Sequence, residues 1–449
     1  MRTSVLVLAV WLAGAAPGPG GAGAVETSLV PLPRPGTVAV ARAPVRPPSA
    51  LAVTASLRPL VRPASLDVTA AAAPAPGNLG FRRWIEGFRP RARAAGITEA
   101  TLDRAFAGVR YNTDVIQRDR NQAEFTKAIW DYLDSAVSPT RVRNGRAAAE
   151  EWSRTLAAIE ARYGVEKEVV AAIWGLESAY GTFRGKTPII GALATLAHDG
   201  RRAEFFEAEL VAALKILQAG DVAPAGMTGS WAGAMGHTQF MPTSYLAHAQ
   251  DFNGDGRRDI WGDNPTDALA STAAYLKHFG WTTGQPWGVE VRLPEGFDYA
   301  LSGERVKKPV GFWTRAGVRD MAGKPVPDHG RASILLPAGA RGAAFMIFDN
   351  FHVIERYNPA DAYVIGVGHL ADRIAGGPPI RADWPRGDRP LRFAERQELQ
   401  ERLNAAGFQT FGVDGIIGPN TIAAIKAFQG RVGMIPDGYA SLQVLNRLR

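Results

Sequence analysis

Hydrophobic residues recur at helical spacing along most of the chain that follows residue 80. The first such segment has four apolar positions at i, i+3, i+4 and i+7, namely Phe81, Trp84, Ile85 and Phe88. The same period continues to about residue 162, and residues 165–180 and 202–218 form two further helical segments, the first of them the most apolar in the chain. The pattern therefore predicts a mainly helical body.

Between about residues 288 and 350 the pattern changes to short apolar runs separated by Gly and Pro, which is typical of strands. The runs are residues 289–293, 333–336 and 344–348. Helical spacing resumes at residues 360–375 and again over 391–449. The predicted fold class is mainly α (α+β), with a small β subdomain and a small C-terminal helical bundle.

The first 78 residues differ from the rest. One positive charge, a short apolar run and small residues predict a signal peptide over residues 1–24, too short to span a bilayer. Residues 25–78 are rich in Pro and Ala and contain no aromatic residue, so they cannot bury enough surface to fold. We expect a disordered tether, and no membrane span in the mature protein.

Composition narrows the classes of partner. Of the 449 residues, 46% are hydrophobic and 21% are charged, a globular balance. Cysteine is absent, which excludes disulfides, thiolate catalysis, Cys-ligated zinc and a lipid anchor on cysteine. The net charge of +8 leaves three acidic partners open: nucleic acid, an anionic membrane or an anionic polymer.

Glu177 is the strongest catalytic candidate. It lies in the segment WGLESAYG at residues 174–181, at the edge of an apolar helical face with no cation one turn away. Burial beside the indole of Trp174 would raise the pKa of this carboxyl group, as a general acid requires. The alternative is a solvent-facing Glu, or one that pairs with a distant cation such as Arg184.

A second segment, residues 229–242, is rich in small residues that let a backbone approach a ligand closely. Ser230 and Gln239 add hydrogen-bonding groups suited to sugar hydroxyls and amides. A tight packing loop explains the same composition equally well.

These segments, together with LATL at 193–196, RRAEFF at 201–206 and RYNPADAY at 356–363, resemble the membrane-bound lytic murein transglycosylase B family. The resemblance runs from about residue 80 to 375. It implies a lysozyme-like catalytic core and cleavage of the β-1,4 bond between N-acetylmuramic acid and N-acetylglucosamine in peptidoglycan. The family pattern places a single acid and base on Glu177, which closes a 1,6-anhydro sugar. It implies no catalytic cofactor, and substrate contacts for Ser230, Gln239, Tyr275, Tyr357, Asn358, Tyr363, Arg201 and Arg202.

Two other functions remain open at this point. A hydrolytic muramidase would use a second carboxylate, such as Asp199 or Asp263. A non-catalytic cell-wall-binding protein would leave Glu177 inert. Nucleic-acid binding is disfavoured, because the Arg residues are scattered and are not interleaved with aromatic side chains.

Residues 251–260, DFNGDGRRDI, match the first half of a calcium loop, in which oxygens at alternate positions converge. Position 12 is Gly262, so the usual bidentate Glu is missing. The resemblance implies a longer loop closed by a later Asp. The expected structural calcium site comprises Asp251, Asn253, Asp255, the Arg257 carbonyl and Asp267. A metal-free turn rich in Asx residues is the alternative.

Residues 391–449 resemble the small helical peptidoglycan-binding domain. We therefore expect five parts: the signal peptide, the tether, a catalytic domain over 79–378 with its β-rich insertion, a linker over 379–390 and the binding domain. Glycan strands of peptidoglycan are the expected partner, the expected location is the periplasm, and the expected oligomeric state is a monomer.

Overall fold

The computed structural model describes residues 76–121 and 127–449. The predicted signal peptide and nearly all of the predicted tether lie outside these residues. The first described helix, α1 (Pro76–Ala94), includes the last three residues of the segment that we expected to be a tether, so the helical body begins slightly earlier than predicted. No helix of the described residues is long and apolar enough to cross a membrane.

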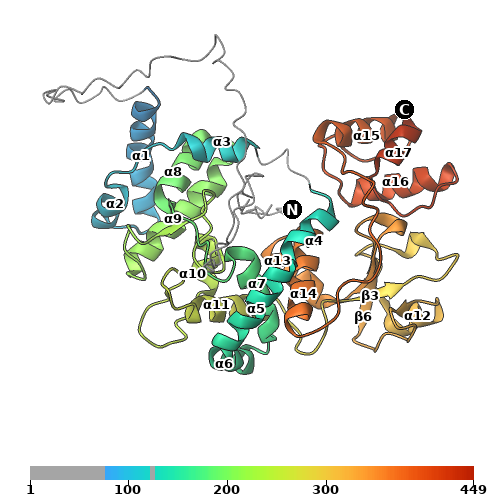
Figure 1. Cartoon of the computed structure of the whole chain (residues 1–449). Helices are drawn as coiled ribbons and strands as arrows, with labels where there is room; N and C mark the ends of the chain where they lie inside the picture. Colours follow the sequence, from blue (N-terminus) through green and yellow to red (C-terminus); the bar gives the residue numbers. More distant parts are fainter. Residues whose placement is uncertain (1–75, 122–126) are drawn as a thin grey trace, which may run out of the picture. The chain divides into compact units, whose positions relative to one another are not determined.

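Helices dominate the described residues that precede residue 280, as the periodicity predicts (Figure 1). After α1 they are α2 (Glu99–Phe106), α3 (Thr113–Asn121), α4 (Ile129–Ala136), α5 (Pro139–Glu151), α6 (Ser153–Tyr163), α7 (Lys167–Ser178), α8 (Ile189–Asp199), α9 (Ala203–Ala219), α10 (Pro242–His248) and α11 (Thr266–His278). A two-residue antiparallel pair, β1 (Thr187–Pro188) and β2 (Thr228–Gly229), links the start of α8 to the segment after α9.

The most apolar helix, α7, lies at the centre of the helical body. It packs against α5, α6, α11 and a later helix, α14 (Asp361–Ile374), as Figure 1 shows for α5 and α14. Seven consecutive residues from Val169 to Gly175 are buried, so this helix is enclosed on nearly all sides. Such a helix makes a rigid support for a side chain in its last turn.

The β insertion is a five-stranded antiparallel sheet in the order β4-β6-β7-β3-β5. Its strands are β3 (Gly288–Arg292), β4 (Lys308–Pro309), β5 (Arg319–Asp320), β6 (Arg331–Leu335) and β7 (Ala344–Ile347). The three predicted runs are β3, β6 and β7, which form the middle of the sheet. One short helix, α12 (Val310–Arg315), was not predicted; it buries Trp313 in a core that belongs to the insertion. Helix α13 (Asp349–Tyr357) leads back to α14.

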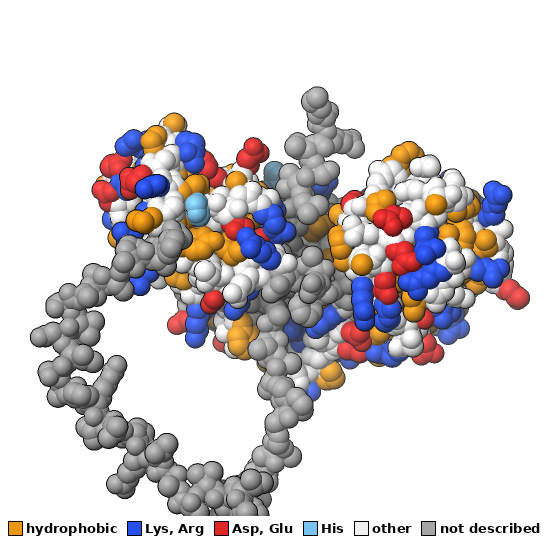
Figure 2. Space-filling view, turned by 90° about the horizontal axis from the view of Figure 1, so that it is seen from above, with side chains coloured by type: hydrophobic (Ala, Val, Ile, Leu, Met, Phe, Trp, Pro, Cys, Tyr) orange, Lys and Arg blue, Asp and Glu red, His pale blue; other side chains and the backbone are white. Residues whose placement is uncertain are grey.

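The C-terminal segment has its own small core of Leu, Ile, Val and Phe side chains. Its helices are α15 (Phe393–Ala405), α16 (Pro419–Arg431) and α17 (Leu442–Leu448), in agreement with the predicted helical bundle. The ammonium group of Lys426 on α16 donates hydrogen bonds to the carbonyl oxygens of Tyr299 and Ser302 in the insertion, at 2.9 and 2.6 Å. Figure 2 shows the molecule from above, and on the described surface of this face basic and acidic side chains are intermixed.

Candidate active site

Glu177 lies in the last turn of α7, and the chain turns sharply just after it. Ala179 and Tyr180 have φ angles of 49° and 58°, in the left-handed region that residues other than Gly rarely adopt. Backbone N–H groups of these two residues donate to the carbonyls of Gly175 and Trp174, which ends the helix. Glu177 is thereby fixed at a helix C-terminus, where the helix dipole disfavours a negative charge.

Packing of Tyr180 maintains this strained turn. Its ring lies against the backbone of Gly175, where a Cβ would be 2.5 Å from the ring. Its hydroxyl donates to the Arg141 carbonyl at 2.9 Å. Steric contacts therefore explain why both of these positions in the WGLESAYG segment are Gly. A Cβ on Gly175 would collide with Tyr180, and a Cβ on Gly181 would lie 2.6 Å from the His237 ring.

The Glu177 carboxyl group has one hydrogen-bond partner among the described residues. The Tyr363 hydroxyl on α14 donates to its Oε1 atom at 2.5 Å. Burial raises the pKa of Glu177 to about 8, and this hydrogen bond opposes part of the rise. The pKa values of Tyr132, Tyr357 and Tyr363 are raised by burial first and then by the Glu177 charge, so the three hydroxyl groups lie within electrostatic reach of the carboxyl group. Glu177 is thus a protonated acid at neutral pH, as predicted.

The indole of Trp174, expected beside Glu177, has other partners. Its Nε1–H donates to His237 Nδ1 at 3.1 Å, and its ring packs edge-on against Tyr180. Because an indole can only donate, His237 Nδ1 accepts and the ring proton lies on Nε2, which is 2.8 Å from the Gly262 carbonyl. No pattern in the sequence singled out His237, yet this ring connects Trp174 on α7 to Gly262, within the predicted calcium loop that Asp267 closes.

The segment 229–242 folds back on itself through isolated bridges between Gly229 and Met235 and between Met235 and Phe240. Ser230 is buried, and its Oγ accepts from the Ala234 N–H at 3.0 Å, so its main contact is within the turn. Gln239 has a left-handed backbone, and its Nε2 donates to the carbonyls of Arg184 and Gly236. Its buried Oε1 has no hydrogen-bond partner among the described residues.

Three further predicted substrate residues are Tyr275 and Tyr357, whose rings are in contact, and Asn358, which directly follows Tyr357. The rings of Tyr275 and Tyr357 are 5.1 Å apart, and the Tyr357 hydroxyl donates to the Thr238 carbonyl at 2.6 Å. The side chain of Asn358 accepts from the Ala360 N–H at 3.1 Å, just before the start of α14, which carries Tyr363. The structure thus brings Tyr357 and Tyr363 to Glu177, whereas the recorded hydrogen bond of Asn358 shapes the turn that precedes α14.

Arg201 and Arg202 have an internal partner. Both guanidinium groups bind Asp119 of α3, whose side chain is 2% exposed. Arg201 donates through Nε at 2.7 Å and Arg202 through one terminal nitrogen at 2.5 Å. These residues therefore neutralise a buried carboxylate, and their predicted contact with substrate carboxylates stays a prediction.

The two carboxylates considered for a hydrolytic mechanism are paired as well. Asp199 binds Arg120 at 2.9 Å and the exposed Asp263 binds Arg184 at 2.9 Å. Neither contributes to the pKa shift of Glu177. The site therefore provides one proton-transfer carboxyl group among the described residues, together with a tyrosine hydroxyl that favours its ionised form.

The predicted calcium loop brings its carboxylates together. Oxygen atoms of Asp251, Asp255 and Asp267 lie within 4.8 Å of one another. Asp267, in the first turn of α11, is 1% exposed and accepts backbone N–H groups of Phe252 and Asp259 at 2.9 and 3.0 Å, so it closes the loop as expected.

The loop backbone supports the same arrangement. The Asn253 side chain accepts from the Asp255 N–H at 2.9 Å, which orders the turn. The Arg257 carbonyl accepts no hydrogen bond within the described residues, so it is available to an ion. An all-oxygen set of this kind fits calcium.

Comparisons with known proteins agree with this geometry. The family model described as "Transglycosylase SLT domain" matches residues 80–372, and a peptidoglycan binding domain model matches residues 394–448. Membrane-bound lytic murein transglycosylase B of Escherichia coli (strain K12) is 34% identical over 252 residues, which cover 54% of this chain and 66%, slightly under two thirds, of that relative.

Solved structures are similar over a larger share of the chain. SltB3 from Pseudomonas aeruginosa, in complex with NAG-anhNAM-pentapeptide, is 52% identical with a TM-score of 0.81 and covers 82% of this chain and 99% of its own. The Escherichia coli lytic transglycosylase Slt35 in complex with calcium is 31% identical with a TM-score of 0.56, over 66% of this chain and 93% of its own. The chain therefore belongs to the transglycosylase SLT family of lytic murein transglycosylases and carries a peptidoglycan-binding domain at its C-terminal end.

Proposed function

We propose that this protein cleaves the β-1,4 bond between N-acetylmuramic acid and N-acetylglucosamine in peptidoglycan and leaves 1,6-anhydro ends. The observation that carries the proposal is the protonated Glu177 beside the Tyr363 hydroxyl, with no second carboxylate acting on it among the described residues. A two-carboxylate hydrolase would need such a partner across the bond. The SltB3 structure contains NAG-anhNAM-pentapeptide, and its anhydro sugar is the kind of product expected here.

The reaction follows from one group acting twice. Glu177 donates its proton to the glycosidic oxygen while the bond from that oxygen to the muramic acid C1 breaks. The resulting carboxylate, which the Tyr363 O–H stabilises, then takes the proton of the C6 hydroxyl as this oxygen bonds to C1. The proton balance closes, Glu177 returns to its acid form, and no water is consumed.

Neighbouring groups would hold the substrate. Gln239 Oε1, buried and unpaired among the described residues, would accept an N–H or O–H of the sugar. Tyr275 and Tyr357 would present an aromatic wall to a sugar face. We assign Ser230 and Asn358 contacts through their remaining hydrogen-bonding capacity, and Arg201 and Arg202 contacts with peptide carboxylates at their exposed edges.

Product analysis in water enriched in oxygen-18 tests the proposal directly. Purified peptidoglycan is digested with the wild-type protein and with Glu177→Gln, and the fragments are analysed by mass spectrometry. We expect ends that lack one water and carry no solvent oxygen, and loss of activity by a factor of about 10² or more in the variant. The matched controls Asp199→Asn and Asp263→Asn should retain activity. Reducing ends labelled with oxygen-18 would contradict the mechanism.

The C-terminal domain and the location of the protein belong to the same proposal. Residues 391–449 would hold the enzyme on peptidoglycan, and residues 1–24 would direct export to the periplasm. With Glu177→Gln present in both chains, the full-length protein should co-sediment with peptidoglycan more completely than a chain that ends at residue 390. Cell fractionation with and without residues 1–24 tests export, and equal periplasmic amounts would contradict it.

The predicted calcium loop, residues 251–267, would hold a structural calcium ion. Asp251, Asn253, Asp255, Asp267 and the Arg257 carbonyl supply only oxygen ligands, which is the set that calcium prefers. The Slt35 structure in complex with calcium supports the assignment. The ion would stabilise the connection between the loop and α11, and it would take no part in proton transfer.

A further inference from the structure

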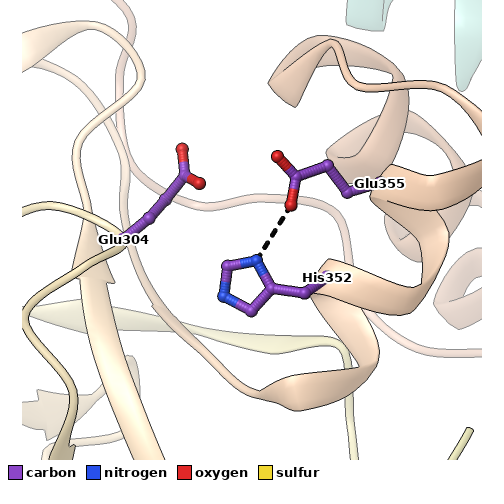
Figure 3. A group of neighbouring side chains, drawn as sticks. All are labelled: Glu304, His352 and Glu355. Atoms are coloured by element: carbon purple, nitrogen blue, oxygen red, sulfur yellow. Dashed lines mark hydrogen bonds and ion pairs between the residues drawn. The ribbon is translucent and has the colours of Figure 1, made fainter. Parts of the chain in front are cut away.

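A second group of potential metal ligands lies where the β insertion meets α13, and it shares no residue with the predicted calcium loop. Glu304 follows the short helix η2 (Tyr299–Leu301) of the insertion, and His352 and Glu355 lie one turn apart on α13. One ligand atom from each of the three side chains lies within 4.8 Å of the others. Figure 3 shows the two carboxylates and the imidazole ring directed toward a common space.

Negative charge in this cluster is poorly compensated. The His352 Nδ1 atom is 2.9 Å from Glu355 Oε2, and these side chains are 28% and 31% exposed. Within the described residues Glu304 forms no ion pair, although Arg305 is near enough to lower its pKa. Burial, followed by the charges of Glu304 and Glu355, raises the pKa of a further carboxyl group, Asp361, to about 7. Two carboxylates and one imidazole thus share a half-buried space.

The mixture of donors indicates which cation would fit. Calcium and magnesium prefer oxygen ligands alone, whereas zinc is bound by imidazole nitrogen and carboxylate oxygen in a tetrahedral set. Tetrahedral ligands about 2.1 Å from zinc lie about 3.4 Å apart. The His352 Nδ1 and Glu355 Oε2 atoms are already closer than this, at 2.9 Å, and the ligand atoms of all three side chains lie within 4.8 Å of one another, so small side-chain movements bring them to zinc-binding distances.

We propose that Glu304, His352 and Glu355 form a zinc site that joins the β insertion to α13, with a water molecule in the fourth position. Two protein ligands come from one helix and the third from the insertion. A bound ion therefore cross-links segments that are separated by about 50 residues of sequence. Since α13 ends at Tyr357, the same ion stabilises the helix that carries this active-site tyrosine.

Metal analysis of the full-length protein tests this proposal. The protein is stripped with a chelator, loaded with zinc in the presence of excess calcium, passed through a desalting column and assayed for bound zinc. We expect one zinc per chain in the wild type, and loss of at least nine tenths of it in His352→Ala and in the isosteric Glu304→Gln. The control Asp251→Asn, which disrupts only the calcium loop, should retain its zinc. Replacement of zinc by cobalt should give the visible absorption of a tetrahedral site.

A thermal measurement adds an independent readout. Zinc should raise the melting temperature of the stripped wild type and of Asp251→Asn, and should leave that of Glu304→Gln unchanged. Circular dichroism of each variant establishes that it is folded before metal analysis. Equal zinc content in wild type and both cluster variants would mean an adventitious ion only and would overturn the proposal, as would a wild-type protein that retains no zinc.

Discussion

The hydrogen bond from Tyr363 to Glu177 makes a quantitative prediction for the variant Tyr363→Phe. The hydroxyl donates to Glu177 Oε1 at 2.5 Å and favours the carboxylate, so its removal raises the pKa of Glu177 above the value of about 8. A hydrogen bond to a charged group contributes about 1.5–3 kcal/mol, and one pKa unit corresponds to about 1.4 kcal/mol. The expected rise is therefore about 1–2 units.

This rise has opposite effects on the two sides of the pH profile. With a pKa of about 8, Glu177 is already about 90% protonated at pH 7, so a higher pKa adds little acid form there. Transfer of its proton to the glycosidic oxygen, however, becomes less favourable by the energy of the lost hydrogen bond. We expect kcat at pH 7 to fall by about 10–100-fold, and the alkaline limb of kcat/KM to move up by about 1–2 pH units.

The assay is the rate of release of anhydro fragments from purified peptidoglycan, measured from about pH 5 to about pH 10. Tyr163→Phe is the matched control, because it loses a hydroxyl that donates to Gln250 at 3.2 Å and has no recorded contact with Glu177. Its profile should coincide with that of the wild type. If the alkaline limb of Tyr363→Phe stays in place or moves down, the hydrogen bond does not favour the carboxylate and the reasoning fails.

Three further predictions concern stability. The pKa of Glu177 is raised in the folded state, so the contribution of this group to the stability of the fold is complete below about pH 4.5 and is lost as the pH rises through about 8. Glu177→Gln should therefore increase the free energy of unfolding by about 2–4 kcal/mol at pH 8 and change it little at pH 5. Urea titrations at the two pH values measure this difference. Gly175→Ala places a Cβ 2.5 Å from the Tyr180 ring and should cost about 1–3 kcal/mol by the same assay, whereas Gly87→Ala, with open space around its Cβ, should not. Removal of calcium should lower the melting temperature of the wild type and leave Asp251→Asn unaffected; equal responses would contradict the proposed ligands.

Local patterns in the sequence predicted the helices and the central strands and singled out Glu177 as the candidate acid, because these depend on residues a few positions apart. Glu177 stood out since its helical neighbours are apolar and uncharged, and α7 is buried as that composition requires. The short helix α12 was missed because six residues among strand-like runs carry too weak a period. The positions of the long helices and of the three central strands were therefore more predictable than the short elements of the β insertion.

The partners of the site residues depend on pairings over long sequence distances, which no local pattern contains. Arg201 and Arg202 were predicted to bind substrate carboxylates. The residue that binds both, Asp119, precedes them by more than 80 positions. His237 had no metal-like spacing and is connected to Trp174 by a contact across 63 positions. Tyr363 was predicted only through the family resemblance, although within the part of the chain that the structure describes it makes the one hydrogen bond to Glu177. Side-chain roles of this kind follow from the folded arrangement of helices.

A single carboxyl group that must act first as acid and then as base requires a surrounding that permits both states. Burial alone would keep Glu177 protonated, and a cation beside it would keep it ionised. Among the described residues neither extreme holds, because a neutral hydroxyl supplies the only hydrogen bond to this carboxyl group. Two of the four described residues other than Gly with positive φ, Ala179 and Tyr180, directly follow the last turn of α7, which carries Glu177. The strain is maintained by the buried α7 and by the contact of Tyr180 with Gly175, so the rigid helical core holds Glu177 in the surroundings that the proposed double proton transfer requires.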